Sequence, residues 1–262
     1  IEGQTTTNYT VSINGAAPTS AVTVALTYSG TATDGTDFTG VANVTIPAGS
    51  SSATFTLATI DDVLVEGAEN FTVTLGTITG TGGFEAIAVN GAASSVTTSI
   101  TDNDTPTISV SNPMVTEGGT AIFTVSLNQS STTAVIFTPN LINGTATLGT
   151  DTAAANTLEV STDGGVTWST VAGDVTIAAG TTSVQLRLAT TDDRLAEGSE
   201  TFQLTATVTS GNTGNLTATG TATVTDETIP GVEDTALVSI SGPGTVIEGQ
   251  TTTNYTVSIN GA

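Results

Sequence analysis

Two stretches decide the fold: IDDVLVEGAENFTVTL at residues 60–75 and TDDRLAEGSETFQLTA at residues 191–206. Both carry the pattern D-D-x-x-x-E-G-x-E, and each then alternates apolar residues with hydroxyl or other polar residues. An alternation with a period of two residues is typical of a β-strand with one buried face. Each stretch therefore predicts an acidic loop that leads into a half-buried strand, and the recurrence predicts two homologous domains.

Further landmarks flank these two stretches in the same order. The segment GTATDGTDF (30–38) matches GTATLGTDT (144–152), and SITDNDTP (99–106) matches TVTDETIP (223–230). The pair Glu2-Gly3 likewise recurs as Glu117-Gly118 and Glu248-Gly249. A shared order of diverged motifs supports a duplication rather than a chance similarity.

A second repeat is undiverged. Residues 1–16 recur without change at residues 247–262, an offset of 246 residues, so the chain spans one long repeat and the start of the next. We therefore expect a first domain over residues 1–104, a second domain over residues 105–230, and the opening of a further repeat over residues 231–262.

The remaining sequence predicts an all-β protein. Thr and Val are poor helix formers and good strand residues, and Gly, Pro and Asn separate the alternating segments. About seven such segments per domain are typical of an antiparallel β-sandwich. The buried faces are expected to include Val22, Val24, Leu26, Phe71 and Val73 in the first domain, and Phe123, Val125, Leu186, Phe202 and Leu204 in the second.

Composition excludes several classes of function. The chain has 24 acidic and 2 basic residues, a formal net charge of −22, and neither His nor Cys. Binding of nucleic acid or of anionic membrane surfaces needs clustered basic residues, which are absent. Without His and Cys, serine–histidine and cysteine–histidine catalysis, imidazole or thiolate zinc sites and disulfides are also excluded. Membrane insertion is not expected either, because no apolar run of about 18 residues occurs.

The acids gather in the recurring motifs, although clustered carboxylates repel each other. A divalent cation gives a reason for such clusters, because Ca²⁺ takes six to eight oxygen ligands and needs neither His nor Cys. Ca²⁺ fits better than Mg²⁺, which tends to retain its waters. A solvated acidic rim that aids solubility is the alternative. A glycosidase-type carboxylate pair is disfavoured, because the same acids recur in both halves, and no enzymatic activity is expected.

The motifs also predict where the acids lie. The D-D-x-x-x-E-G-x-E acids share one loop at one end of the sandwich, and Asp102 and Asp104 follow the last strand. If Glu2 and Asp37 lie at that same end, eight carboxylates converge on one site in the first domain.

Taken together, these motifs resemble the Calx-β domain, and the resemblance covers residues 1–104 and about 105–228. It implies tandem immunoglobulin-like sandwiches of seven strands, each binding several Ca²⁺ ions at one tip. The implied ligands of the first domain are Glu2, Asp37, Asp61, Asp62, Glu66, Asp102 and Asp104. Those of the second domain are Glu117, Asp151, Asp192, Asp193, Glu197 and Asp226.

Two departures affect that ligand set. Glu69 and Glu200 match the motif but are left out, because one residue of each E-G-x-E is expected to point elsewhere. At the end of the second domain Thr228 stands opposite Asp104, and Glu227 stands opposite Asn103. The second site is therefore expected to hold fewer ions or to use Glu227.

The context indicates the function. Long, nearly identical repeats with few basic residues and no Cys resemble the extender region of giant RTX-type bacterial surface adhesins, which act in cell adhesion and biofilms. The implied role is a secreted, cell-surface spacer that Ca²⁺ makes rigid, with adjacent repeats of the same chain as its partners. The alternatives are a carbohydrate- or protein-binding adhesion module, using a Trp168 hairpin within residues 153–176 or the loop at residues 79–92, and a Ca²⁺ sensor domain.

The repeat register also predicts an unpaired strand. The counterpart of LVSISGPGTV (237–246) is expected as the first strand of the first domain, but it does not precede Ile1 in this chain. Residues 232–246 are therefore expected either to be loosely held or to dock head-to-tail on the first domain of a neighbouring chain, donating the strand.

Overall fold

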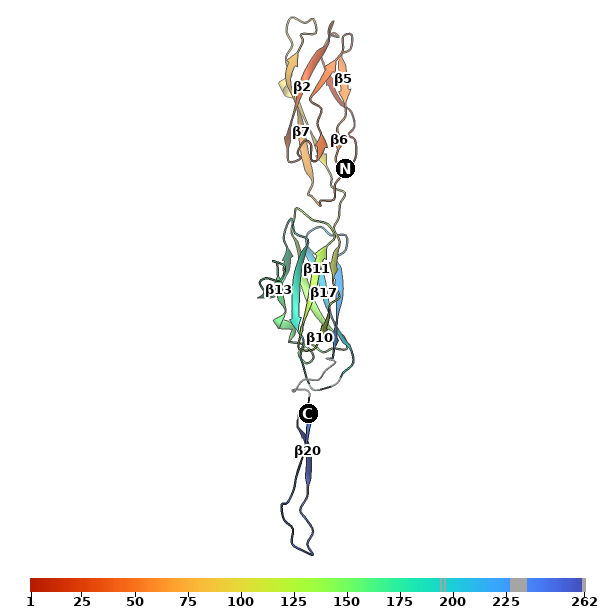
Figure 1. The fold of residues 1–262 in the computed structure, drawn as a ribbon. Helices are drawn as coiled ribbons and strands as arrows, with labels where there is room; N and C mark the ends of the chain where they lie inside the picture. The colour runs from red at the N-terminus through yellow and green to blue at the C-terminus, as the bar shows by residue number, and fades with distance from the viewer. Residues whose placement is uncertain (194, 196, 227–234, 261–262) are drawn as a thin grey trace. The chain divides into compact units, whose positions relative to one another are not determined.

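A computed structural model describes residues 1–193, 195, 197–226 and 235–260, and it separates into two compact units (Figure 1). Unit 1 comprises Ile1–Pro106 and Gln129–Thr133, and unit 2 comprises Thr107–Asn128 and Ala134–Ala262. The described part is built from strands and two short 3₁₀ turns, η1 (Gly91–Ala93) and η2 (Ala155–Thr157). The predicted all-β fold class is confirmed.

Unit 1 contains one four-stranded sheet and two strand pairs, all antiparallel. The sheet has the order β4-β2-β7-β8, with β4 at Asn43–Ile46, β2 at Val22–Gly30, β7 at Glu69–Thr79 and β8 at Ser95–Ile100. The pairs join β1 (Tyr9–Ser12) to β5 (Ser52–Phe55) and β3 (Phe38–Thr39) to β6 (Ala58–Thr59).

Unit 2 contains two five-stranded sheets. One has the order β10-β18-β17-β12-β15, at Met114–Thr116, Thr217–Thr225, Glu200–Ser210, Val135–Asn143 and Val175–Ile177. The other has the order β14-β13-β16-β11-β9, at Ser169–Thr170, Glu159–Ser161, Ser183–Ala189, Thr120–Leu127 and Ile108–Val110. Only the β10–β18 pair is parallel among these described strands.

The two sheets of unit 2 account for the seven strands that the family resemblance implies. The strands β9 and β10 are two pieces of the first strand, which crosses from one sheet to the other at Asn112-Pro113. Asn112 Oδ1 accepts a hydrogen bond from Thr221 N (2.7 Å), and Pro113 has no N–H to donate to a ladder. The strands β13 and β14 belong to the Trp168 hairpin within residues 153–176, an insertion that has no counterpart in unit 1. Counting β9 and β10 as one strand and leaving out β13 and β14 reduces the ten strands of the two sheets to seven.

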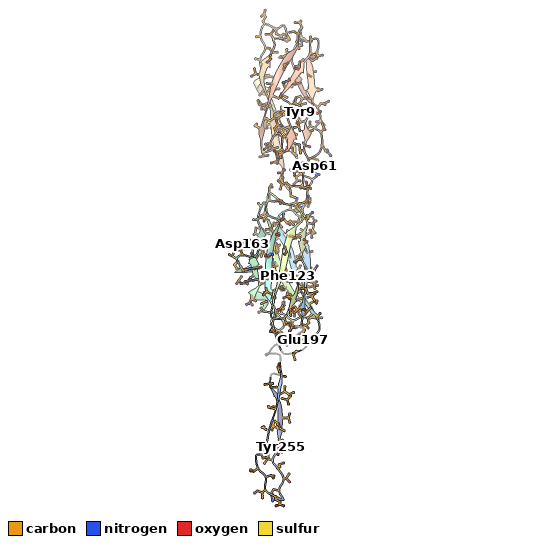
Figure 2. All side chains as sticks on the ribbon, viewed as in Figure 1. Tyr9, Asp61, Phe123, Asp163, Glu197 and Tyr255 are labelled. Atoms are coloured by element: carbon orange, nitrogen blue, oxygen red, sulfur yellow. The ribbon has the colours of Figure 1, made fainter. Side chains whose placement is uncertain are left out.

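Each core is built around aromatic residues of the deciding motif. Phe71 stacks on Phe38 with ring centroids 4.4 Å apart, and Phe202 meets Phe123 edge-on at 5.7 Å. All four side chains are fully buried, and Figure 2 shows Phe123 among the strands of unit 2. Packed rings of this kind contribute beyond their buried area. The apolar alternation of the sequence therefore does form the interior, as predicted.

The inserted hairpin ends in a turn organised by Asp163 (Figure 2). The Asp163 carboxylate accepts hydrogen bonds from Thr167 N (2.9 Å), Val166 N (3.0 Å) and two hydroxyl groups, of which Ser161 Oγ lies at 2.7 Å. These bonds favour the ionised form and lower the pKa of Asp163. The carboxylate of Asp163 therefore stabilises the turn of the hairpin.

Trp168 follows that turn and packs against the sheet. Its Nε1 donates to Gly165 O (3.0 Å), and the Arg187 guanidinium lies 4.2 Å from the centroid of its ring. Arg187 Nε in turn contacts Glu159 Oε2 at 2.7 Å, on the neighbouring strand β13. The indole's N–H and one of its faces are thus occupied by the protein, as expected if the hairpin packs onto the sandwich.

The last described strands form a separate two-stranded ribbon. Strand β19 (Leu237–Ser241) pairs antiparallel with β20 (Thr256–Asn260), with Val238 opposite Ile259 and Ile240 opposite Val257. The described residues include no helix with the length and hydropathy needed to cross a bilayer.

The core assignment predicts a large cost for truncating Phe71. Replacing this fully buried ring with Ala should lower the unfolding free energy of unit 1 by about 3–5 kcal/mol, because a cavity remains. Denaturant unfolding followed by circular dichroism measures the change. Thr97→Ala, at an exposed position of β8, is the control and should cost less than about 1 kcal/mol. Equal effects of the two substitutions would contradict this core.

Candidate metal centre

The E-G motif forms a turn that contacts an aspartate of the D-D pair. Gly3 and Gly118 have φ angles of 67° and 70°, a region that side chains other than glycine rarely adopt. A Cβ at Gly3 would lie 3.0 Å from Asp61 Cβ, and a Cβ at Gly118 would lie 3.1 Å from Asp192 Cβ. Glycine therefore lets the first aspartate of the D-D pair approach the turn, which explains why the two motifs recur together.

The G-T-D motif forms a second turn in both units. Asp37 Oδ2 accepts a hydrogen bond from Thr33 N, and Asp151 Oδ2 accepts one from Thr147 N at 2.6 Å. Each bond spans four residues and closes the loop around the acid. The contact engages one carboxylate oxygen and holds the side chain in a fixed direction.

The acids of the D-D loop and of the last strand also organise backbone. Asp62 and Asp193 each accept a hydrogen bond of 2.7 Å, from Leu64 N and Leu195 N respectively. Asp102 accepts one from Glu66 N (2.6 Å), and Asp226 accepts the matching one from Glu197 N (3.0 Å). The end of the last strand is thereby joined to the E-G-x-E loop in the same way in both units.

These turns bring Glu2, Asp102 and Asp104 together in unit 1. One oxygen from each carboxylate lies within 4.8 Å of the others. Glu2 is only 7% exposed, and its backbone N donates to Thr101 O (3.1 Å). Glu2 Oε2 and Asp104 Oδ2 are both buried without a hydrogen-bond partner. Buried carboxylate oxygens normally have hydrogen-bond partners, so these two oxygens are available to a ligand.

A second type of group is present in both units. In unit 1 it consists of Asp37, Glu66 and Glu69, and in unit 2 of the corresponding Asp151, Glu197 and Glu200. The grouped oxygens again lie within 4.8 Å of one another. Because the two units have diverged in sequence, the recurrence of this geometry shows that it follows from the motifs themselves.

The grouped acids repel one another. The pKa of Glu2 is raised to about 7, first by burial and then by the charges of Asp102, Asp62, Glu66 and Asp104. Burial is also the main cause of the raised pKa values of Glu66 and Glu69, with nearby carboxylates adding to it.

Unit 2 shows the same electrostatic pattern. The pKa values of Glu197 and Glu200 are raised first by burial and then by neighbouring acids, Asp193 for Glu197 and Asp151 for both. The only basic side chains in the sequence are Arg187 and Arg194, and residues 1–106 contain none. The sequence of the first domain therefore provides no side-chain cation that could neutralise its carboxylates.

The structure divides the predicted ligands between the groups and the turns beside them. Seven of them belong to the three groups: Glu2, Asp37, Glu66, Asp102, Asp104, Asp151 and Glu197. Five others lie in the adjoining turns, as described above: Asp61, Asp62, Asp192, Asp193 and Asp226. Glu117 N donates to Thr225 O (3.0 Å), the counterpart of the Glu2 contact. Glu227 and Thr228 lie outside the described residues.

Two acids left out of the predicted set belong to the groups. Glu69 and Glu200 begin β7 and β17, and each stands two residues before a buried phenylalanine. Strand alternation places residues i and i+2 on the same face, so both glutamates point to the core side of the sheet. That alternation was the signal in the sequence that would have included them.

That eight carboxylates share one site in unit 1 stays a prediction. Six of the acids of unit 1 form two groups of three, and within each group the carboxylate oxygens lie within 4.8 Å of one another. The charge of Asp62 contributes to the raised pKa of both Glu2 and Glu66, so the two groups influence each other.

A family model described as the Calx-beta domain matches residues 1–104 and 149–228. Among solved structures, the chain is similar to CBD12 from CALX1.2, with 16% identity over 83% of this chain and 92% of that chain (TM-score 0.33). It is also similar to CfaE, the adhesive subunit of the CFA/I fimbria of enterotoxigenic Escherichia coli, with 14% identity over 70% and 65% (TM-score 0.39). No curated protein matches the chain.

The raised pKa values predict a pH dependence in the absence of divalent cations. Between pH 4.5 and about 7 the folded chain retains a proton on Glu2 that the unfolded chain has released. The contribution of Glu2 to stability is therefore present at low pH and lost as the pH rises through 7. Thermal melts in chelator should show a lower melting temperature for unit 1 at pH 8 than at pH 5.5.

Glu2→Gln is the control for this effect, because glutamine does not titrate. The variant should lose part of the difference between the two pH values. A wild-type difference that persists unchanged in the variant would exclude Glu2 as its source.

Proposed function

Because the chain belongs to the Calx-beta domain family, we propose that its carboxylate groups bind Ca²⁺ and that it is a calcium-stabilised spacer of a secreted bacterial surface adhesin. One observation carries the metal site: Glu2 Oε2 and Asp104 Oδ2 are buried without a partner beside other carboxylates. Burying charge without compensation is costly, and a dication compensates several carboxylates at once.

The chemistry of the donors favours Ca²⁺. All grouped atoms are carboxylate oxygens, the ligands preferred by hard cations, and nitrogen or sulfur donors from His or Cys are absent from the sequence. Bound Ca²⁺ would supply the positive charge that the first domain lacks. In unit 1 the ligands would be Glu2, Asp102 and Asp104 in one group and Asp37, Glu66 and Glu69 in the other; in unit 2 they would be Asp151, Glu197 and Glu200.

The position of these residues in the chain explains how binding would stabilise the fold. The first group links the turn at Glu2 to the end of β8, at Asp102 and Asp104. The second links the G-T-D turn at Asp37 to the loop and first residue of β7. Loops that are distant in sequence would thus be fastened to one another, and binding to the folded state alone raises stability by mass action.

The spacer role and the location outside the cell rest on the chain as a whole. The unchanged recurrence of 16 residues at an offset of 246 and the strongly acidic composition suit a tandem array whose neighbours are further repeats. Extracellular calcium modules need only about 10⁻⁴–10⁻³ M affinity. In the hairpin, Trp168 contacts Gly165 and Arg187, so the protein itself uses the N–H and one face of the indole.

The proposal predicts that Ca²⁺ raises the melting temperature and that Glu66→Gln reduces this gain. At a free Ca²⁺ concentration about 100 times the Kd, one site adds about 2.7 kcal/mol of stability. Thermal melts with Ca²⁺ and with chelator measure the gain, and titration calorimetry measures the number of ions bound. Glu66→Gln should lose at least one ion.

Glu85→Gln is the matched control, because Glu85 is an exposed acid of unit 1 outside the two groups. It removes the same charge and should keep both the calcium gain and the stoichiometry. If the two variants had equal effects, the calcium response would come from general screening of negative charge. That result would contradict a binding site at Glu66.

A further inference from the structure

Unit 1 contains a second, short piece of chain, Gln129–Thr133, which joins β11 to β12 in the sequence. This segment lies outside both ranges that the Calx-beta model matches, residues 1–104 and 149–228. The recurring motifs therefore do not predict that it adjoins the acids. In the structure the segment contacts one carboxylate group of unit 1 directly, and it contacts the loop that carries part of the other.

The direct contact is a hydrogen bond from Gln129 to a carboxylate of the first group. Gln129 Nε2 lies 2.9 Å from Asp104 Oδ1, and the two residues are 25 positions apart in the sequence. An ionised carboxylate only accepts hydrogen bonds, so the amide presents its nitrogen to Asp104. The other oxygen, Asp104 Oδ2, is buried without a hydrogen-bond partner, as is Glu2 Oε2. The contact therefore occupies one oxygen of Asp104 and leaves the second one available to an ion.

Asp102 and Asp104 are oriented by different parts of the chain. Asp102 accepts a backbone N–H on each oxygen, from Asp104 N on Oδ1 (2.7 Å) and from Glu66 N on Oδ2 (2.6 Å). Both of those donors belong to the acidic motifs themselves. The donor to Asp104 is instead a side chain of the segment Gln129–Thr133. The direction of the Asp104 carboxylate therefore depends on a residue outside the motifs.

The segment is fixed to the acidic loop by backbone hydrogen bonds. Val65 forms a parallel bridge with Ser131: Val65 N donates to Ser130 O (2.9 Å), and Thr132 N donates to Val65 O (2.8 Å). Val65 and Ser131 are both only 2% exposed. Val65 directly precedes Glu66, whose carboxylate belongs to the second group. The segment therefore has a defined position beside the loop from which its amide side chain reaches the first group.

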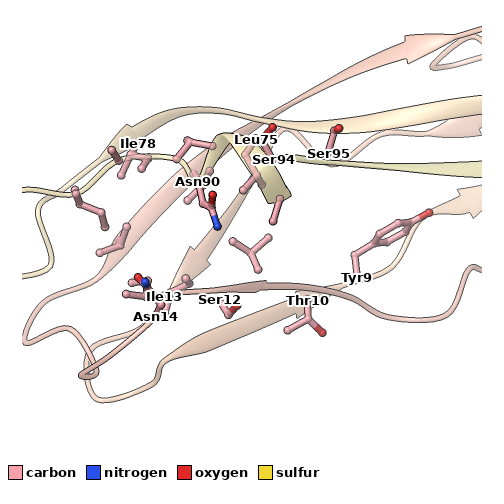
Figure 3. Close-up of a pocket in the computed structure, with 18 of the residues that line it drawn as sticks. Tyr9, Thr10, Ser12, Ile13, Asn14, Leu75, Ile78, Asn90, Ser94 and Ser95 are labelled. Carbon is pink, nitrogen blue, oxygen red and sulfur yellow. The ribbon is translucent and has the colours of Figure 1, made fainter.

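The strand that precedes Gln129 does not by itself require a donor at this position. The sequence TVSLN at residues 124–128 matches TVSIN at residues 10–14, which ends at Asn14, just beyond β1 (Figure 3). The next residue is Gln129 in the first case and Gly15, with a φ of 100°, in the second. The amide is therefore a feature of the segment that adjoins the acids, and the similar strand in unit 1 continues without one.

We propose that Gln129 is a positioning residue for a calcium site at Glu2, Asp102 and Asp104, an inference that rests on the calcium binding proposed above. Its amide holds Asp104 by Oδ1 and keeps Oδ2 available to the ion. Because the amide is neutral, it orients the carboxylate without cancelling the negative charge that attracts a cation. Groups that hydrogen-bond to metal ligands commonly fix their direction in this way, and their loss costs about 10–100-fold in metal affinity.

Titration calorimetry of the full chain with Ca²⁺ tests this role. Gln129→Met keeps a side chain of similar length and removes the donor, so one bound ion should be held about tenfold or more weakly while the others are unchanged. Gln203→Met is the matched control. Gln203 Nε2 donates to the Thr221 hydroxyl (3.3 Å), and strand alternation places Gln203 on the opposite face of β17 from Glu200. This control should bind Ca²⁺ like the wild type.

Two further measurements separate positioning from a general loss of structure. In the Asp104→Ala chain, which lacks the positioned carboxylate, adding Gln129→Met should not change the affinity of the ions that remain. Hydrogen exchange in the wild type should slow on addition of Ca²⁺ at the amides of Val65 and Thr132, because an ion that fixes Asp104 also fixes the segment hydrogen-bonded to it. Gln129→Met should reduce this slowing.

The possible failures are distinguishable. A wild-type chain that binds no Ca²⁺ would overturn the proposed function and this inference with it. Calcium binding that Gln129→Met leaves unchanged, or that Gln129→Met and Gln203→Met weaken equally, would overturn the inference alone. A further loss of affinity from Gln129→Met in the Asp104→Ala chain would show that Gln129 does not act through Asp104, and would also overturn it.

Discussion

Repulsion between carboxylates that the fold forces together is the constraint on which the candidate site depends. The backbone turns of the E-G and G-T-D motifs and the ends of the strands fix these side chains, so they cannot move apart without breaking hydrogen bonds of the turns. Burial raises the pKa of Glu2 further, and the first domain contains no basic side chain to offset the charge. The fold therefore keeps like charges close together, and a bound dication would reduce the repulsion between them.

Core and site are coupled through single strands. Strand β7 begins at Glu69 and reaches the buried Phe71 two residues later, and β17 repeats this arrangement with Glu200 and Phe202. The aromatic ring anchors the strand, and the alternation of the strand then aims the glutamate at its group. A change that loosens the core therefore also displaces a carboxylate of the group, which gives a physical reason for the close spacing of E-G-x-E and the apolar alternation.

The repeated motifs were sufficient to predict the strands, the buried faces and most of the acids that come together. They do not specify features that depend on three-dimensional detail. The separation of the acids of unit 1 into two groups depends on the direction of each side chain, and the split of the first strand into β9 and β10 depends on the crossing at Asn112-Pro113. Glu69 and Glu200 were omitted although strand alternation already indicated their direction.

The most direct measurement of the central claim is an anomalous difference map from crystals of the chain grown with Ca²⁺ and exchanged with a lanthanide. The account predicts peaks among Glu2, Asp102 and Asp104, among Asp37, Glu66 and Glu69, and among Asp151, Glu197 and Glu200. Well-ordered carboxylates pointing into solvent, with no peak between them, would contradict it.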